Sequence, residues 1–199
     1  KALPRYCFEG DNFSLWSYVN IHGNWTAPWF RVTSGLTDVA HKNGVAVGCV
    51  YSIPWAASVT LTGSNKYSQV WRKLTERDEN DNFKYVDNFV KMLRYYGIDG
   101  IGVNSEFNSD YDTMEEWREF IKACHKRAKE LNWHFQLHWY DYTGDSGQNA
   151  ADRGLGSHNK ENFGTGDDIV TDMLFANYNW NNTVLANTVT NAKKYGRSS

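Results

Sequence analysis

The chain has 199 residues, a length typical of one domain or at most two small ones. Its 21 basic and 23 acidic residues give a net charge of −2, which excludes the basic surface of a nucleic-acid-binding protein, and no apolar run approaches the roughly 18 residues that cross a bilayer. Nine Trp, twelve Tyr and ten Phe residues exclude a disordered chain; they also suggest a sugar-binding surface, although aromatic residues fill ordinary cores too.

The first half of the chain alternates short apolar runs with helical patterns. Gly44 follows the first helical pattern, at the place where a left-handed C-terminal cap belongs. Pro54 ends a run rich in β-branched residues. Together these patterns predict strands over 18–22 and 45–53, and helices over 34–43, 67–74 and 82–96.

The second half repeats this alternation with clearer spacing. Thr113 and Glu116 match a capping box, so that Thr113 is predicted to open a helix. In that helix Trp117, Phe120 and Cys124 recur on one face, which predicts a stripe packed on the core. The remaining patterns predict strands over 99–106, 134–141 and 173–180, and a last helix over 182–195.

Strands that alternate with helices predict a parallel sheet in which each crossover is a helix. The last three strands start about every 35 to 40 residues, the pitch of a (β/α) barrel unit, and a complete eight-stranded barrel takes roughly 250 residues. Five strands are visible, or six if the region 6–8 is counted. We therefore predict that residues 1–199 form a single partial α/β barrel of the (β/α)8 TIM type, which lacks its last strands. A doubly wound open sheet is the alternative, but its phosphate-binding glycine fingerprint is absent from the sequence.

No cofactor or metal is predicted. The sequence has no phosphate loop, no zinc-ligand spacing and no Ser-His-Asp order. Its three cysteines fit neither a disulfide framework nor a zinc site, and Cys49 and Cys124 lie in patterns that make them small core residues. The first ten residues lack the apolar centre of a signal peptide, so the sequence leaves the compartment open.

Two predicted strands carry polar side chains on the face that would line a barrel. In Asp99-Gly-Ile-Gly-Val-Asn-Ser-Glu106 the alternation places Gly100, Gly102, Asn104 and Glu106 on the inner face. Asn104 and Glu106 come last, at the strand end where barrel enzymes build their sites, about 7 Å apart along one face. A solvated glutamate at a strand end is the alternative interpretation of Glu106.

The next strand repeats the arrangement. His134, Gln136, His138 and Tyr140 share one face, which is more polarity than a core needs. Two histidines four residues apart on a strand are about 13 Å from one another, so a shared metal ion is not expected.

These motifs resemble a known family. Tyr95-Tyr-Gly-Ile-Asp-Gly-Ile-Gly-Val-Asn-Ser-Glu106 is similar to the catalytic strand of the family 85 glycoside hydrolases, the endo-β-N-acetylglucosaminidases. Three further motifs agree in order and spacing over about 18–197: Ala40-His-Lys-Asn-Gly-Val-Ala-Val-Gly48, His138-Trp-Tyr-Asp141 followed by Gln148-Asn149, and Asp172-Met-Leu-Phe-Ala-Asn-Tyr-Asn-Trp180.

The sequence departs from the family at one position of interest. The family usually carries a Trp just before the Gln-Asn pair, in a loop over the sugar, where this chain has Gly147. The contacts of that loop with a substrate are therefore in question. The family barrel also continues beyond the last residue of this sequence.

The resemblance implies hydrolysis of the β-1,4 bond between the two N-acetylglucosamines at the core of N-glycans. It implies a retaining, substrate-assisted mechanism, one of the variations on the two-carboxylate scheme. Glu106 would be the general acid and base, which requires a largely apolar setting while it carries its proton. Asn104 would hold the substrate's 2-acetamido group as its oxygen attacks the anomeric carbon, and Tyr140 would bond near the same group.

The resemblance also implies a set of sugar contacts and a location. His138, Tyr178 and Trp180 are the expected substrate contacts, with Trp55 as a further candidate whose alternative is loop packing. N-glycans or glycoproteins are the expected partners, and the location implied is secreted or cell-surface, with the cytoplasm as the alternative. A catalytically silent carbohydrate-binding barrel is the competing function. Neither the preferred glycan type nor the oligomeric state follows from the sequence.

Overall fold

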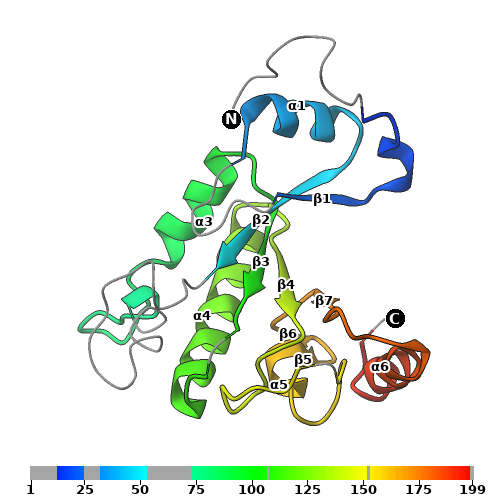
Figure 1. Ribbon diagram of the computed structural model, residues 1–199. Coiled ribbons are helices and arrows are strands. Elements are labelled where there is room, and N and C mark those ends of the chain that lie inside the picture. Colours follow the sequence, from blue (N-terminus) through cyan, green and yellow to red (C-terminus); the bar gives the residue numbers. More distant parts are fainter. Residues whose placement is uncertain (1–12, 25–31, 53–72, 107, 152, 198–199) are drawn as a thin grey trace.

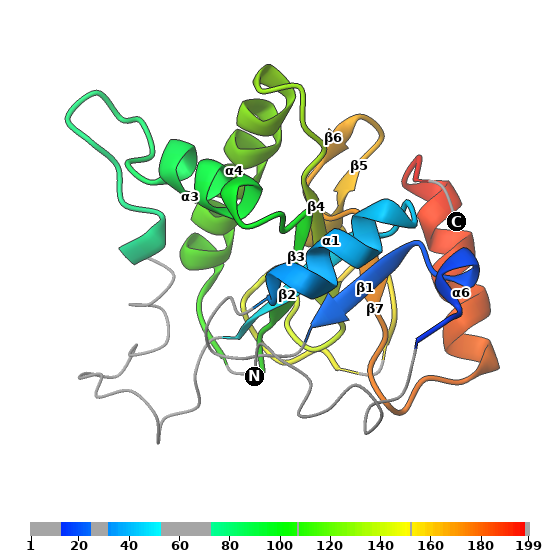
Figure 2. The same ribbon diagram turned by 90° about the horizontal axis from the view of Figure 1, so that it is seen from above.

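The structure is a computed structural model that describes residues 13–24, 32–52, 73–106, 108–151 and 153–197. Its main element is a parallel sheet of five strands that curls into an open half-barrel (Figures 1 and 2). Neighbouring strands in the sheet are also consecutive along the chain, apart from one small hairpin, and this order is that of a barrel. The strands, in spatial order, are β1 (Ile21–Asn24), β2 (Ala46–Ser52), β3 (Gly100–Asn104), β4 (Gln136–Tyr140) and β7 (Met173–Phe175).

Helices connect the strands. Figure 1 shows α3 and α4 beside the sheet, where they pack against each other, while α1 packs on β2 and α6 lies on the side of β7. The predicted partial α/β barrel is confirmed. The remaining elements are η1 (Trp16–Tyr18), α1 (Ser34–Lys42), α3 (Val86–Tyr95), α4 (Tyr111–Glu130), α5 (Lys160–Phe163), the hairpin β5 (Gly164–Thr165) and β6 (Asp168–Ile169), and α6 (Asn182–Lys194).

All five strands differ from their predicted bounds. β3, predicted over 99–106, ends at Asn104, β4, predicted over 134–141, begins at Gln136, and β2 is one residue shorter at each end. The first strand begins at Ile21, where pairing with β2 starts at Ala46, and the residues before it form η1. The last strand was predicted over 173–180, but β7 ends at Phe175, because the last residue of its partner β4, Tyr140, is paired there. A strand continues only while a neighbour supplies ladder hydrogen bonds. The region 6–8 and most of the predicted helix 67–74 lie outside the described residues.

Polar side chains set the start of three helices. Thr33 caps α1, and Asn181 caps α6 by accepting a hydrogen bond from the Val184 amide at 3.0 Å. In α4 the cap is Asp110, whose Oδ1 accepts from the Thr113 amide at 2.7 Å. The predicted cap at Thr113 is therefore wrong, because a carboxylate three residues earlier already satisfies that amide.

The core lies between the outer face of the sheet and helices α3 and α4. The predicted stripe of α4 is buried: Trp117, Phe120 and Cys124 are at most 1% exposed. The outward-facing Ile101 and Leu137, from β3 and β4, are fully buried in the same cluster. Because successive side chains of a strand point to opposite faces, one set packs in the core and the alternate set lines the inner face, where the site lies.

Two aspartates repeat one arrangement at the opposite end of the strands. Asp99 precedes β3, and its Oδ2 accepts a hydrogen bond from the Val47 amide of β2 at 2.7 Å; His41 Nε2 lies 2.7 Å from the same oxygen. Asp172 precedes β7, and its Oδ2 accepts from the Leu137 amide of β4 at 2.7 Å. Each carboxylate therefore joins the start of one strand to its neighbour, away from the end that carries the site.

Candidate active site

All five parallel strands contribute to a cavity of about 360 Å³ on the inner side of the sheet. Its polar lining side chains are Asn104, His138 and Tyr140, which the sequence predicted to face inward from β3 and β4. Asn104 and Tyr140 are the last residues of their strands. The structure thus brings these three predicted residues together at one cavity.

Glycines keep the cavity open. Gly23, Gly48 and Gly102, from three neighbouring strands, lie in its wall. A Cβ added at Gly102 would meet nothing nearer than Val50 Cγ2 at 3.9 Å, and one at Gly23 would meet nothing within 4 Å. Gly23 and Gly102 could therefore hold a side chain, and its absence leaves space for a ligand.

The polar lining carries no charge at neutral pH. Asn104 and Tyr140 are each 7% exposed, and burial lowers the pKa of His138, so its imidazole is neutral there. Among the lining residues that the structure describes, none is a carboxylate. The cavity can therefore accept a neutral polar group such as an amide, and its described lining offers no carboxylate nucleophile.

Glu106 is not part of this lining. It lies two residues beyond the end of β3 and is half-buried, in the segment that leads toward α4. Ser105, between Glu106 and Asn104, is 1% exposed, and its hydroxyl lies 2.8 Å from that of Thr143. The acid candidate thus lies beyond the cavity, next to an anchored residue.

The predicted aromatic wall lies elsewhere than expected. Tyr178 and Trp180 were placed on one face of a strand, but β7 ends before them, and they are 84% and 54% exposed and outside the cavity lining. Trp55 lies outside the described residues. The aromatic lining comes instead from Phe175, whose ring centroid is 5.7 Å from that of Tyr140. Period-two alternation from Met173 was the sequence signal that could have identified Phe175.

Gly147 joins two loops at this end of the sheet. Its carbonyl accepts from the Ser109 amide at 2.7 Å, and Gln148 Nε2 donates to the Ser109 carbonyl at 2.6 Å. Gly147 is buried, with φ +77°, and a Cβ there would lie 2.6 Å from Ser109 Oγ and 2.8 Å from the Asp110 nitrogen. A side chain here, such as the Trp expected from the resemblance, would force the two loops to move apart.

The described part of the chain shows neither a metal-binding cluster nor a membrane-spanning helix. No group of three or more His, Cys, Asp or Glu residues is placed there to bind a metal ion. Among the same residues, no helix combines the length and hydrophobicity needed to span a membrane.

Comparison with known proteins places this geometry in context. The sequence pattern of glycosyl hydrolase family 85 matches residues 6–199. The glycoside hydrolase domain of Endo-D from Streptococcus pneumoniae R6 is similar in structure, with a TM-score of 0.78 and 25% identity over 92% of this chain, which spans 28% of that chain. The spore cortex-lytic enzyme SleL from Bacillus megaterium gives a TM-score of 0.47 at 13% identity, over 80% of this chain and 35% of that one. No curated protein matches the sequence.

Proposed function

Since the chain belongs to glycosyl hydrolase family 85, we propose that it carries the catalytic cleft of an endo-β-N-acetylglucosaminidase. The bond cleaved is the β-1,4 linkage between the two N-acetylglucosamines at the core of N-glycans. Residues 1–199 are then part of one catalytic barrel, and glycoproteins with N-glycans are its substrates. Because such glycoproteins are found outside cells, we also propose a secreted or cell-surface location.

One observation supports this proposal most directly: an amide, Asn104, ends β3 at the cavity, and the described lining holds no carboxylate that could act as the nucleophile. A retaining enzyme without a carboxylate nucleophile needs another nucleophile. The 2-acetamido oxygen of the substrate is suited to this role, since it can attack the anomeric carbon and form an oxazoline. The uncharged cavity lined by Asn104, His138 and Tyr140 has the polarity to hold that acetamido group.

Each residue then has a distinct role. Glu106 donates its proton to the leaving oxygen and afterwards takes a proton from the attacking water. Asn104 orients the acetamido group and stabilises the charge that develops on it, while Tyr140 bonds to the same group from the neighbouring strand. His138, neutral and half-buried, contacts the sugar in the cavity.

The exposed aromatic residues take part farther out. Tyr178 and Trp180 follow β7 with their side chains largely exposed, which suits stacking on sugar units that extend beyond the cavity. We propose that they contact the outer glycan rather than the N-acetylglucosamine at the cleaved bond.

The test uses the natural full-length protein and a glycoprotein with one defined N-glycan. Release leaves a single N-acetylglucosamine on the protein, so mass spectrometry identifies the bond that is cut. Glu106→Gln should lower release by about 10²- to 10⁴-fold, the usual contribution of general acid–base catalysis. Glu79→Gln is the matched control. Glu79 is an exposed glutamate outside the cavity lining, so this variant should cleave the glycan normally.

A synthetic sugar oxazoline separates the roles of the two residues. Asn104→Ala should also suppress hydrolysis, because the oxazoline no longer forms, but it should still transfer sugar from a ready-made oxazoline to an acceptor. Glu106→Gln should lose much of that transfer, since the acceptor needs a base. Normal hydrolysis by Asn104→Ala would refute substrate assistance. A wild-type protein that binds the glycan without cutting it would instead be a carbohydrate-binding barrel.

A further inference from the structure

Ser105 and Thr143 form a reciprocal pair of hydrogen bonds beside Glu106. The two hydroxyl oxygens are 2.8 Å apart, and Thr143 Oγ1 is also 2.9 Å from the Ser105 carbonyl oxygen. A carbonyl only accepts, and a threonine hydroxyl has one proton to give. Thr143 therefore donates to the carbonyl, and Ser105 donates to Thr143. Both side chains are at most 2% exposed, so water does not compete for these bonds.

The hydrogen bond from Thr143 to the Ser105 carbonyl acts on the backbone directly before Glu106. The Ser105 carbonyl belongs to the peptide unit that leads into Glu106, and a peptide unit is planar. A hydrogen bond that fixes this oxygen therefore fixes the plane from which the Glu106 backbone departs. Asn104, on the other side of Ser105, is held in the strand ladder of β3. Thr143 thus acts on the first residue beyond that ladder.

Thr143 is itself held by two side chains. Its carbonyl accepts from Trp139 Nε1 at 3.0 Å and from Asn162 Nδ2 at 3.3 Å. Trp139 is a residue of β4 and is 1% exposed, and Asn162 is 1% exposed. The threonine is therefore fixed to the sheet on one side and to α5 on the other.

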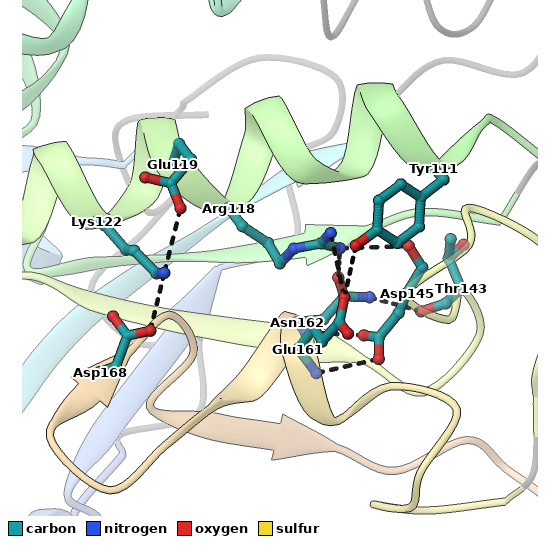
Figure 3. Close-up of polar contacts among 9 residues, drawn as sticks. All are labelled: Tyr111, Arg118, Glu119, Lys122, Thr143, Asp145, Glu161, Asn162 and Asp168. Carbon is teal, nitrogen blue, oxygen red and sulfur yellow. Dashed lines mark hydrogen bonds and ion pairs between the residues drawn. The ribbon is translucent and has the colours of Figure 1, made fainter.

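Arg118 extends this anchoring to α4, as Figure 3 shows. Its guanidinium Nη1 donates to Asn162 Oδ1 at 3.1 Å and to the Asp145 carbonyl at 3.2 Å. Asp145 Oδ1 in turn accepts a hydrogen bond from the backbone amide of Asn162 at 2.8 Å. Arg118 is 5% exposed. The network thus joins the loop after β4 to the helix that follows Glu106.

We propose that Thr143 is a positioning residue for Glu106: it orients the Ser105–Glu106 peptide through the reciprocal hydroxyl pair. This inference rests on the proposed function, in which Glu106 is the acid and base. Arg118 and Asn162 keep Thr143 in place and act only through it. The contact joins residues 38 positions apart in the sequence, and it holds the acid at a fixed angle to the cavity beside it.

The test is Thr143→Val in the natural full-length protein, which keeps the side-chain shape and removes both hydroxyl bonds. The kcat for glycan release should fall about tenfold, since misplacement of a catalytic group by about 1 Å can cost 10²-fold. KM should stay within about twofold because the cavity lining is untouched. Thr143→Ser keeps the hydroxyl and should restore most of kcat.

Thr37→Val is the matched control. Thr37, in α1, is also buried, and its hydroxyl donates to the Thr33 carbonyl at 3.2 Å, away from Asn162 and from the end of β3. Thr37→Val removes one hydrogen bond where Thr143→Val removes two, so it should lose somewhat less stability. Equal kcat values for the two variants, measured per folded molecule, would overturn the inference.

The double variant of Thr143→Val and Glu106→Gln distinguishes a failure of this inference from a failure of the proposed function. In Glu106→Gln the Thr143→Val change should have no further effect on the residual rate, because the group it orients is gone. A tenfold effect that persists there would overturn the inference and leave the role of Glu106 standing. Full activity of Glu106→Gln would refute the proposed function, and this inference with it.

Discussion

Replacing Gly147 with alanine tests whether the two loops can pack this closely only because residue 147 has no side chain. The residue has φ +77°, and a non-glycine residue in this left-handed region costs about 1–2 kcal/mol. The added Cβ would also lie 2.8 Å from the Asp110 nitrogen, a backbone atom that no rotamer change can move.

The clash has a cost that can be worked out from the bonds it breaks. To relieve it the loops must separate, which removes the Ser109 amide bond to the Gly147 carbonyl and the Gln148 bond to the Ser109 carbonyl. At about 1 kcal/mol each, these add about 2 kcal/mol. We expect Gly147→Ala to lower the free energy of unfolding by about 3–4 kcal/mol in total.

Gly44→Ala is the matched control for this variant. Gly44 follows Asn43, the C-cap of α1, and has φ +71°, but a Cβ there would meet nothing within 4 Å. It should therefore show only the backbone cost of about 1–2 kcal/mol. The difference between the variants, about 2 kcal/mol, corresponds to about 4–8 °C in Tm for a domain of this size. Thermal and urea unfolding measure it, and equal losses in the two variants would refute the steric argument.

Two further predictions concern the cavity and the buried network. Gly102→Ala should keep or slightly raise stability, because its Cβ meets no close atom, yet raise KM for the glycan by narrowing the cavity; Gly100→Ala, whose Cβ would lie 2.6 Å from the Gln136 carbonyl oxygen, should lose stability instead. Thermal unfolding measures the stability of both variants, and steady-state kinetics measure the KM of Gly102→Ala. An unchanged KM for Gly102→Ala would contradict the prediction that its methyl group narrows the cavity. Burial raises the pKa of Asp145 to about 6, so the folded state holds its proton more tightly than the unfolded chain, where an aspartate titrates near about 3.9. Stability should therefore fall as pH rises from about 4 to about 6, and urea unfolding across this range should show that Asp145→Asn lacks this component.

The sequence was sufficient for the features that depend on local periodicity. Alternation at period two placed Gly102 and Asn104, and His138 and Tyr140, on the inner face, because successive side chains of a strand point to opposite sides. The helical stripe of α4 likewise predicted its buried face, including Trp117. Strands separated by helices were enough for a parallel order, since a parallel pair requires such a crossover.

The tertiary structure decided where the elements stop and what meets across loops. β7 ends at Phe175 because its partner β4 has no further residue to pair, and this leaves Tyr178 and Trp180 outside the cavity. The bond between Ser105 and Thr143 joins separate loops, and no local pattern records such a contact. Strand ends and loop contacts depend on neighbours distant in sequence, so they exist only once the sheet has formed.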